Sequence, residues 1–227
     1  KLIQPMMARI RCSKAVRIGI VVLASLSLAW FFLPRGLALY YQSRAGAIIA
    51  NHIGQSGDDG EEQFTCLLPI LKDLNPERQP PISKAIGILR KAASFDPANA
   101  HTYYLLGRSY CLQQDYEQAV LAFEIYQQNR PKNPLGQMEK ALAYFAWSQS
   151  LPQTEKPEQD RLLDQSVKAL REAGVSASLL RSHGDIAYQD RAYGTAWVWY
   201  NLLAAYRSVP DEILFKKSLL DIVFSDE

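Results

Sequence analysis

The pattern of apolar and polar positions between Ala100 and Asn133 predicts two helices joined by a short turn. Gln114 and Asp115 make a polar break, and the side chain of Asp115 is suited to cap the second helix. Pro131 is suited to end that helix. Val, Ile and Thr rarely alternate with polar residues along the chain, so the pattern favours an all-α fold without a sheet.

The same spacing recurs, which distinguishes a repeat from an isolated helical hairpin. Gly184 precedes Ala196 by twelve residues and Tyr200 by sixteen, as Gly107 precedes Ala119 and Phe123. Weaker copies of the pattern comprise Ala85, Leu89, Ala92 and Pro97 upstream, and Ala141 and Tyr144 between the two clear copies. In the middle copy the insertion SQSLPQTEKPEQD displaces the second helix, which we expect to resume near Arg161 with Ala169 and Ala173.

These residues resemble the signature of the tetratricopeptide repeat (TPR) family, which has a bulky residue, Leu-Gly, Tyr, Ala, Phe and Pro at fixed offsets. In the strongest copy they are Tyr103, Leu106, Gly107, Tyr110, Ala119, Phe123 and Pro131. The small Gly107 and Ala119 let two antiparallel helices approach, while larger neighbours fill the space beside them. The resemblance covers residues 83–210 and implies a TPR-type α-solenoid; an ordinary helical bundle is the alternative.

The N-terminal region contains sixteen uncharged residues, from Ile18 to Leu33, followed by Pro34 and Arg35. As a helix this stretch is about 24 Å long, somewhat less than the roughly 30 Å hydrocarbon core that flanking basic and aromatic residues help to span. We therefore predict a transmembrane helix over residues 18–35. A cleaved signal peptide is the competing interpretation, but no convincing small-x-small cleavage site follows.

Basic residues predict the orientation of this helix. Five precede it and only two follow closely; they are Lys1, Arg9, Arg11, Lys14 and Arg17, then Arg35 and Arg44. By the positive-inside bias, residues 1–17 are a cytoplasmic N-terminus and the repeats lie on the periplasmic or outer side of a cell membrane.

The remaining segments connect or cover the repeats. Residues 36–82 are expected to hold a juxtamembrane helix and a linker, because GQSGDDGEEQ is acidic and Gly-rich and NPERQPPIS is Pro-rich. Residues 83–210 are the repeats. Residues 211–227 form an amphipathic helix that we expect to cap the open end of the array; docking of a partner is the alternative. Trp197 and Trp199 cannot both share the inward face of Tyr200, so one is either exposed or covered by that helix.

Composition excludes several classes of function. The net charge is only +2, and no basic run interleaved with aromatics appears among the repeats, so nucleic acid is not an expected partner. Cys12, Cys66 and Cys111 are too few and too scattered for a disulfide framework or a zinc site. We interpret them as small buried hydrophobic residues, with Cys66 and Cys111 meeting only by accident of folding.

No catalytic motif is present: there is no HExxH, no Gly-rich phosphate loop and no GxSxG. His183-Gly184-Asp185 is the nearest approach to a site, but packing of the repeat explains it better. The acidic residues near Asp58 lack the order of a calcium loop. The chain is therefore expected not to be an enzyme and to hold no cofactor or metal.

The family resemblance implies that positions two, five, nine and twelve of each first helix face a concave, protein-binding groove. They are His101, Tyr104, Arg108 and Cys111, then Leu135, Met138, Leu142 and Phe145, then Ser178, Arg181, Asp185 and Tyr188. We select Tyr104, Arg108, Met138, Leu142, Phe145, Arg181, Asp185 and Tyr188 as candidate partner-binding residues. This groove suits a segment with apolar anchors, and Arg108 and Arg181 are candidate donors. The alternative is that the insertion, the linker or the terminal helix fills the groove.

Together these features predict a membrane-anchored scaffold or accessory subunit whose protein partners are integral membrane subunits. An assembly or secretion factor that binds clients transiently, and the outer repeat domain of an envelope-glycan synthesis system, are the alternatives.

Overall fold

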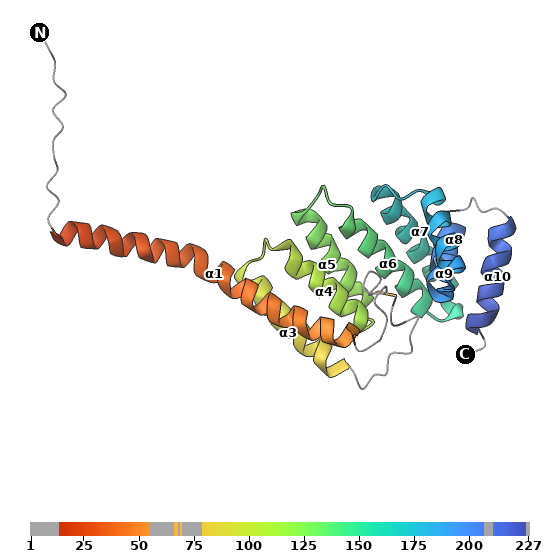
Figure 1. The fold of residues 1–227 in the computed structure, drawn as a ribbon, viewed down its shortest axis with the longest axis horizontal. Helices are drawn as coiled ribbons and strands as arrows, with labels where there is room; N and C mark the ends of the chain where they lie inside the picture. The colour runs from red at the N-terminus through yellow and green to blue at the C-terminus, as the bar shows by residue number, and fades with distance from the viewer. Residues whose placement is uncertain (1–13, 55–65, 68, 70–78, 207–210, 226–227) are drawn as a thin grey trace, which may run out of the picture.

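The described part of the chain consists almost entirely of helices, and from α3 to α9 short turns connect them (Figure 1). The computed structural model describes residues 14–54, 66, 67, 69, 79–206 and 211–225, and no β-strand occurs among them. The prediction of an all-α fold is confirmed for this part of the chain. Most of the predicted linker, residues 55–65, 68 and 70–78, lies outside the described residues.

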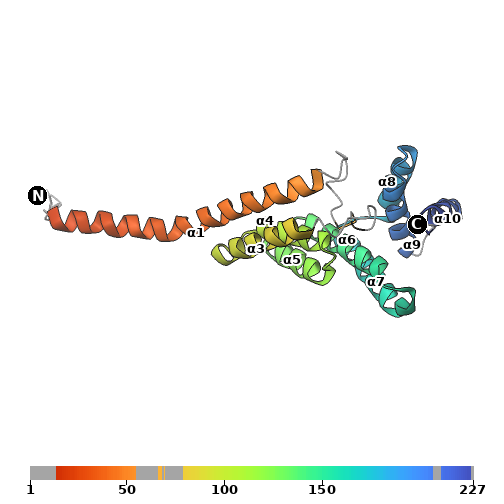
Figure 2. The same cartoon turned by 90° about the horizontal axis from the view of Figure 1, so that it is seen from below.

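Helices that follow one another in sequence pack together in pairs (Figures 1 and 2). The second half of α1 packs along α3, α4 along α5, α6 along α7, and α8 along α9, with α10 against α9. The elements are α1 (Lys14–Gly54), α3 (Gln79–Phe95), α4 (Ala100–Leu112), α5 (Tyr116–Asn129), α6 (Leu135–Ser150), the 3₁₀ turn η3 (Gln153–Glu155), α7 (Lys156–Glu172), α8 (Ala177–Gln189), α9 (Tyr193–Ala205) and α10 (Asp211–Ser225).

Two helix pairs share one packing contact, in which an aromatic ring lies against a helical glycine. A Cβ added to Gly107 would lie 2.5 Å from Cε1 of Phe123, and one added to Gly184 would lie 2.5 Å from Cε1 of Tyr200. Both distances are far below van der Waals contact, so only glycine fits. The small size predicted for Gly107 and the packing role predicted for Gly184 are confirmed.

The turns inside these two pairs are also alike. Gln114 and Arg191 lie seven residues after the two glycines and adopt left-handed φ angles of 60° and 62°. In the first pair, a carboxylate oxygen of Asp115 accepts a hydrogen bond from the backbone N–H of Gln118 at 3.4 Å, which confirms the predicted cap. Helix α5 ends at Asn129, two residues before Pro131.

The middle pair accommodates the predicted insertion. Helix α6 extends into it as far as Ser150, and the 3₁₀ turn then leads into α7. Helix α7 begins at Lys156, five residues before the predicted position, because Pro157 is accepted in the first helical turn. The Ser166 hydroxyl donates to the carbonyl oxygen of Ala141 at 2.8 Å, so the two helices touch at the small position predicted from the spacing.

Helix α1 has two halves with different surroundings. In the first half Trp30 is 86% exposed, whereas Ala45 and Ile49 in the second half are buried. The other large apolar side chains exposed in the first half are Val22, Leu23, Leu26, Leu28, Phe32 and Leu33. Pro34 lies inside the helix. Among the described residues, no helix is both long and apolar enough to cross a membrane, so the predicted transmembrane helix over residues 18–35 is not supported.

Helix α10 covers part of α9. Ile213 and Leu220 are buried, and the indole N–H of Trp197 donates to Oδ1 of Asp221 at 2.9 Å. Trp199 is only 6% exposed and Tyr200 is fully buried. Of the two alternatives for the tryptophans, cover by the C-terminal helix is therefore the one observed.

The glycine contact yields a direct test of the packing. Replacing Gly107 with Ala should lower the free energy of unfolding by about 1–3 kcal/mol, because the new methyl group meets the buried ring of Phe123. Gly87 is the matched control: it is helical and exposed, with nothing within 4 Å of an added Cβ, so Gly87→Ala should stabilise by about 0.5–1 kcal/mol. Chemical denaturation measures both. Equal effects of the two substitutions would contradict the packing assigned to Gly107.

Candidate protein-binding groove

The predicted groove positions on α4 lie in a row along the helix. His101 is exposed, its ring centre lies 5.9 Å from that of Tyr104, and the Arg108 guanidinium carbon lies 5.6 Å from the Tyr104 ring centre. Partial burial, and then the nearby charge of Arg108, lower the pKa of His101. The imidazole of His101, the phenol of Tyr104 and the guanidinium of Arg108 therefore follow one another at intervals of one helical turn. Together they form a surface that can make both polar and aromatic contacts.

The predicted positions on α6 are mostly inside the core. Met138 is half-buried, Leu142 is 3% exposed and Phe145 is fully buried. The Phe145 ring lies edge-on to Trp197 of α9, with centres 6.0 Å apart. The apolar middle of the groove is thus already in contact with another part of the chain.

Two of the predicted positions on α8, Asp185 and Tyr188, contact α10. Asp185 accepts hydrogen bonds from the Tyr200 hydroxyl at 2.8 Å and from Nζ of Lys216 at 3.0 Å, and Arg181 Nε lies 3.5 Å from its second oxygen. Burial acts to raise the pKa of Asp185, but the Lys216 and Tyr200 hydrogen bonds and the charges of Lys216 and Arg181 together hold it below its ordinary value. Nζ of Lys216 also lies 5.7 Å from the Tyr188 ring centre. Helix α10 therefore engages Asp185 and Tyr188.

The linker reaches the groove through a disulfide. Cys111, at the fourth groove position of α4, is bonded to Cys66, and both residues are fully buried together with Leu67. The interpretation of the cysteines as small unpaired hydrophobes is wrong for this pair. The two lie 45 residues apart, and only the return of the linker to α4 brings them together.

Glu139 on α6 is a buried acid that the groove pattern does not include. It is 2% exposed, and the Tyr104 hydroxyl donates to its Oε1 at 3.2 Å. Its Oε2 is buried and has no hydrogen-bond partner in the part of the chain that the structure describes. Burial raises the pKa of Glu139 to about 7, against the opposing charge of Arg108 and the hydrogen bond from Tyr104. Glutamate is usually exposed, so only the tertiary contacts reveal this position.

The predicted groove residues thus fall into two groups. The Tyr104–Glu139 hydrogen bond joins α4 to α6, whereas Asp185 and Tyr188 contact Lys216 of α10. Two of the segments named in the alternative contact predicted groove positions, the linker through Cys66 and the terminal helix through Lys216. Trp197, which contacts Phe145, belongs to α9 and to none of those segments. His101, Tyr104 and Arg108 remain at least partly accessible.

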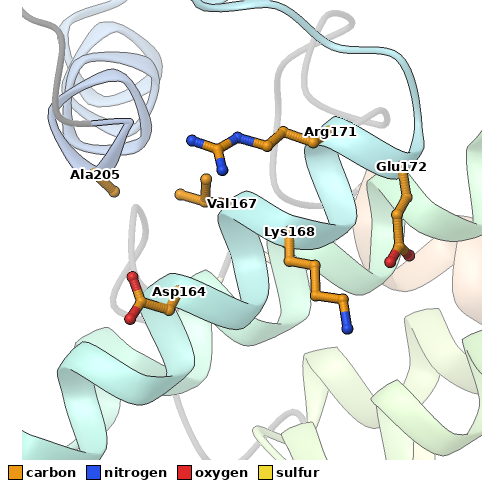
Figure 3. A pocket seen from close by; sticks show the side chains of 6 residues that line it. All are labelled: Asp164, Val167, Lys168, Arg171, Glu172 and Ala205. Atoms are coloured by element: carbon orange, nitrogen blue, oxygen red, sulfur yellow. The ribbon is translucent and has the colours of Figure 1, made fainter.

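A hollow of about 520 Å³ lies between α7 and the end of α9 (Figure 3). Val167 and the Arg171 guanidinium point toward Ala205, whereas Lys168 and Glu172 point away from it. The guanidinium carbon of Arg171 lies 5.1 Å from the Tyr206 ring centre. Charges of both signs line this hollow, so it does not select one kind of ligand. Among the described residues, no group of three His, Cys, Asp or Glu side chains can hold a metal ion.

Comparison of the chain with protein-family models, with curated proteins and with solved structures finds no match.

Reduction of the Cys66–Cys111 disulfide should lower the free energy of unfolding by about 4 kcal/mol, because the 45-residue loop it closes gains entropy in the unfolded chain. Denaturant titrations with and without a dithiol reductant measure this loss. The Cys66→Ala variant is the control, since its stability should not respond to the reductant. A wild-type chain that also fails to respond would rule out the bond.

Glu139 predicts a dependence of stability on pH. Its pKa of about 7 in the folded chain lies above the ordinary 4.5, so the folded state holds the proton more tightly than the unfolded state. Stability should therefore fall as the pH rises from 4.5 to 7, by roughly 3 kcal/mol in total. Glu139→Gln has no proton to lose and should abolish this slope, whereas replacement of the exposed Glu117 by Gln should leave it intact. A slope that survives Glu139→Gln would assign the pH dependence to another group.

Proposed function

We propose that this chain is a non-catalytic TPR scaffold or accessory subunit that is held at a membrane and binds a protein partner of a larger membrane complex. The proposal rests on the observation that one chain combines a packed array of helix pairs with an α1 helix whose first half exposes apolar side chains.

The array supports the repeat assignment. The contact between Gly107 and the Phe123 ring recurs between Gly184 and the Tyr200 ring, and in both the ring follows its glycine by sixteen residues. A turn residue with a left-handed φ angle also follows each glycine at the same distance. Repeats of this type present long surfaces to other proteins.

The exposed half of α1 supports membrane attachment. Leu23, Leu28 and Trp30 point in different directions around the helix axis at 100° per residue, yet they are 66%, 58% and 86% exposed. A helix that is apolar on all sides is stable within an apolar environment and not in water. We therefore propose that the first half of α1 attaches the chain to a membrane.

The disulfide supports a location outside the cytoplasm, on the periplasmic or outer side. Cytosolic thiols are kept reduced, so a buried structural disulfide such as Cys66–Cys111 belongs to an oxidising compartment. The excess of basic residues before Ile18 favours the same side by an independent argument.

The partner is proposed to bind where the groove remains accessible, along His101, Tyr104 and Arg108 of α4. A cation and two aromatic or imidazole rings suit a segment that presents a carboxylate and an apolar anchor. Asp185 and Tyr188 become available only where α10 is displaced, whereas the side chain of Arg181 is 42% exposed beside it.

Membrane attachment is tested by fractionation. The wild-type chain should sediment with membranes and resist a high-salt wash, whereas Leu26→Asp combined with Leu28→Asp should release most of it. The matched control combines Leu179→Asp with Leu214→Asp, which are exposed leucines elsewhere in the chain and should leave sedimentation unchanged. Equal release of both double variants would count against attachment through α1.

Partner binding is tested by purification in mild detergent and mass spectrometry. Stoichiometric membrane proteins should co-purify, and Arg108→Glu should reduce their recovery at least tenfold, since charge-assisted hydrogen bonds at an interface contribute strongly. Glu117→Lys, on the exposed surface of α5, is the control. Recovery of the chain alone and monodisperse would overturn the subunit role, and substoichiometric clients would favour an assembly factor.

A further inference from the structure

An apolar hollow of about 480 Å³ lies between α1 and the C-terminal end of α3. Residues of α1 between Leu26 and Leu37 form one side, and Phe95 of α3 forms the other. Every lining residue is apolar, and Leu26, Trp30 and Leu33 are each more than 60% exposed. The hollow is therefore open and continuous with the exposed apolar half of α1.

The hollow exists because the two halves of α1 diverge. Pro34, one of the lining residues, lies inside the helix, where its ring removes a backbone hydrogen bond and favours a bend. Figure 2 shows that the first half of α1 is bent away from the axis of the second half, which packs along α3. The wedge between the first half and Phe95 is left unfilled by protein.

One cation lies beside this wedge. The Phe95 ring stacks on Tyr41 with centres 5.8 Å apart and planes 1° from parallel, and Nζ of Lys91 lies 5.1 Å from the Tyr41 ring centre. Lys91 is one helical turn before Phe95 on the same face of α3. Arg35 follows Pro34 directly and is exposed. Arg35 is two residues from both Leu33 and Leu37, so it lies on the other face of α1, and Lys91 is the basic group beside the Phe95 wall of the hollow.

The surrounding charge has one sign. Helices α1 and α3 contain no Asp or Glu in their sequences, although the whole chain has 23 acidic and 25 basic residues. Their basic residues are Lys14, Arg17, Arg35 and Arg44 on α1 and Lys84, Arg90 and Lys91 on α3. Asp96 follows directly after α3 as the nearest acid in sequence. The part of the chain that carries the exposed apolar segment is therefore also its most basic part.

We propose that this hollow binds an anionic phospholipid. An acyl chain lies against Leu33, Leu37 and Phe95, and the phosphate meets Lys91. A lipid fits better than an apolar peptide, because the hollow continues into a helix exposed on all sides, which a single partner face cannot cover. Basic groups close to a membrane surface bind anionic lipid headgroups. The inference rests on the proposed membrane attachment and adds a specific site to it.

The test is flotation of the full-length chain with vesicles of phosphatidylcholine, with or without phosphatidylglycerol. Phosphatidylglycerol should strengthen binding, and Lys91→Gln should weaken it by roughly fivefold. Lys132→Gln, which removes one charge from the exposed turn between α5 and α6, should have no effect. Circular dichroism verifies that each variant is helical.

A second readout reports on the hollow itself. Trp30 lines it, so brominated acyl chains on phosphatidylglycerol should quench Trp30 fluorescence more than the same chains on phosphatidylcholine. Subtraction of the Trp30→Phe signal isolates this residue from the other three tryptophans. Phe95→Ala, which removes the opposite wall, should abolish the preference.

Each outcome separates the two proposals. Equal binding to both vesicle types would overturn the lipid site and leave membrane attachment standing. Equal weakening by Lys91→Gln and Lys132→Gln would show a diffuse charge effect and overturn the site. Absence of flotation with either vesicle type would overturn attachment as well.

Discussion

Close approach of two helices at a glycine is the contact on which the array depends. At Gly107 and Gly184 an aromatic ring occupies the space that any side chain would need, so the rings of Phe123 and Tyr200 can be fully buried. Ring burial of this kind is among the largest apolar contributions to a small helical core. These two contacts set how closely α4 packs on α5 and α8 packs on α9, and the neighbouring helices α3 and α6 pack against the first of these pairs.

Contacts between nearby positions in the sequence were predictable, and contacts between distant positions were not. The glycine, its ring and the turn between them lie within sixteen residues, so spacing alone predicts that they meet. Cys66 and Cys111 meet because the linker returns to α4, and no local pattern encodes that return. The early start of α7 has a local cause in Pro157, but the length of the insertion obscured it.

The same distinction applies to the candidate groove. Helical periodicity places Tyr104, Arg108 and Asp185 on the predicted face, but periodicity does not indicate what covers that face. Lys216 of α10 and Trp197 of α9 provide the cover, and both belong to elements far along the chain. Glu139 was missed for a related reason, since its burial follows from the packing of α4 on α6. The first half of α1 differs from the predicted groove, because its apolar side chains are exposed and the described part of the chain does not cover them.

The Cys66–Cys111 bond also changes how the chain carries mechanical load. Tension applied at the N-terminal end of α1 passes along the backbone to Cys66, crosses the two sulfur atoms and enters α4 at Cys111. The 44 residues between the two cysteines, which include α3 and most of α4, lie outside this covalent path. A pull that separates α1 from the repeats is therefore transmitted to the rest of the array while the bypassed segment keeps its own end-to-end distance.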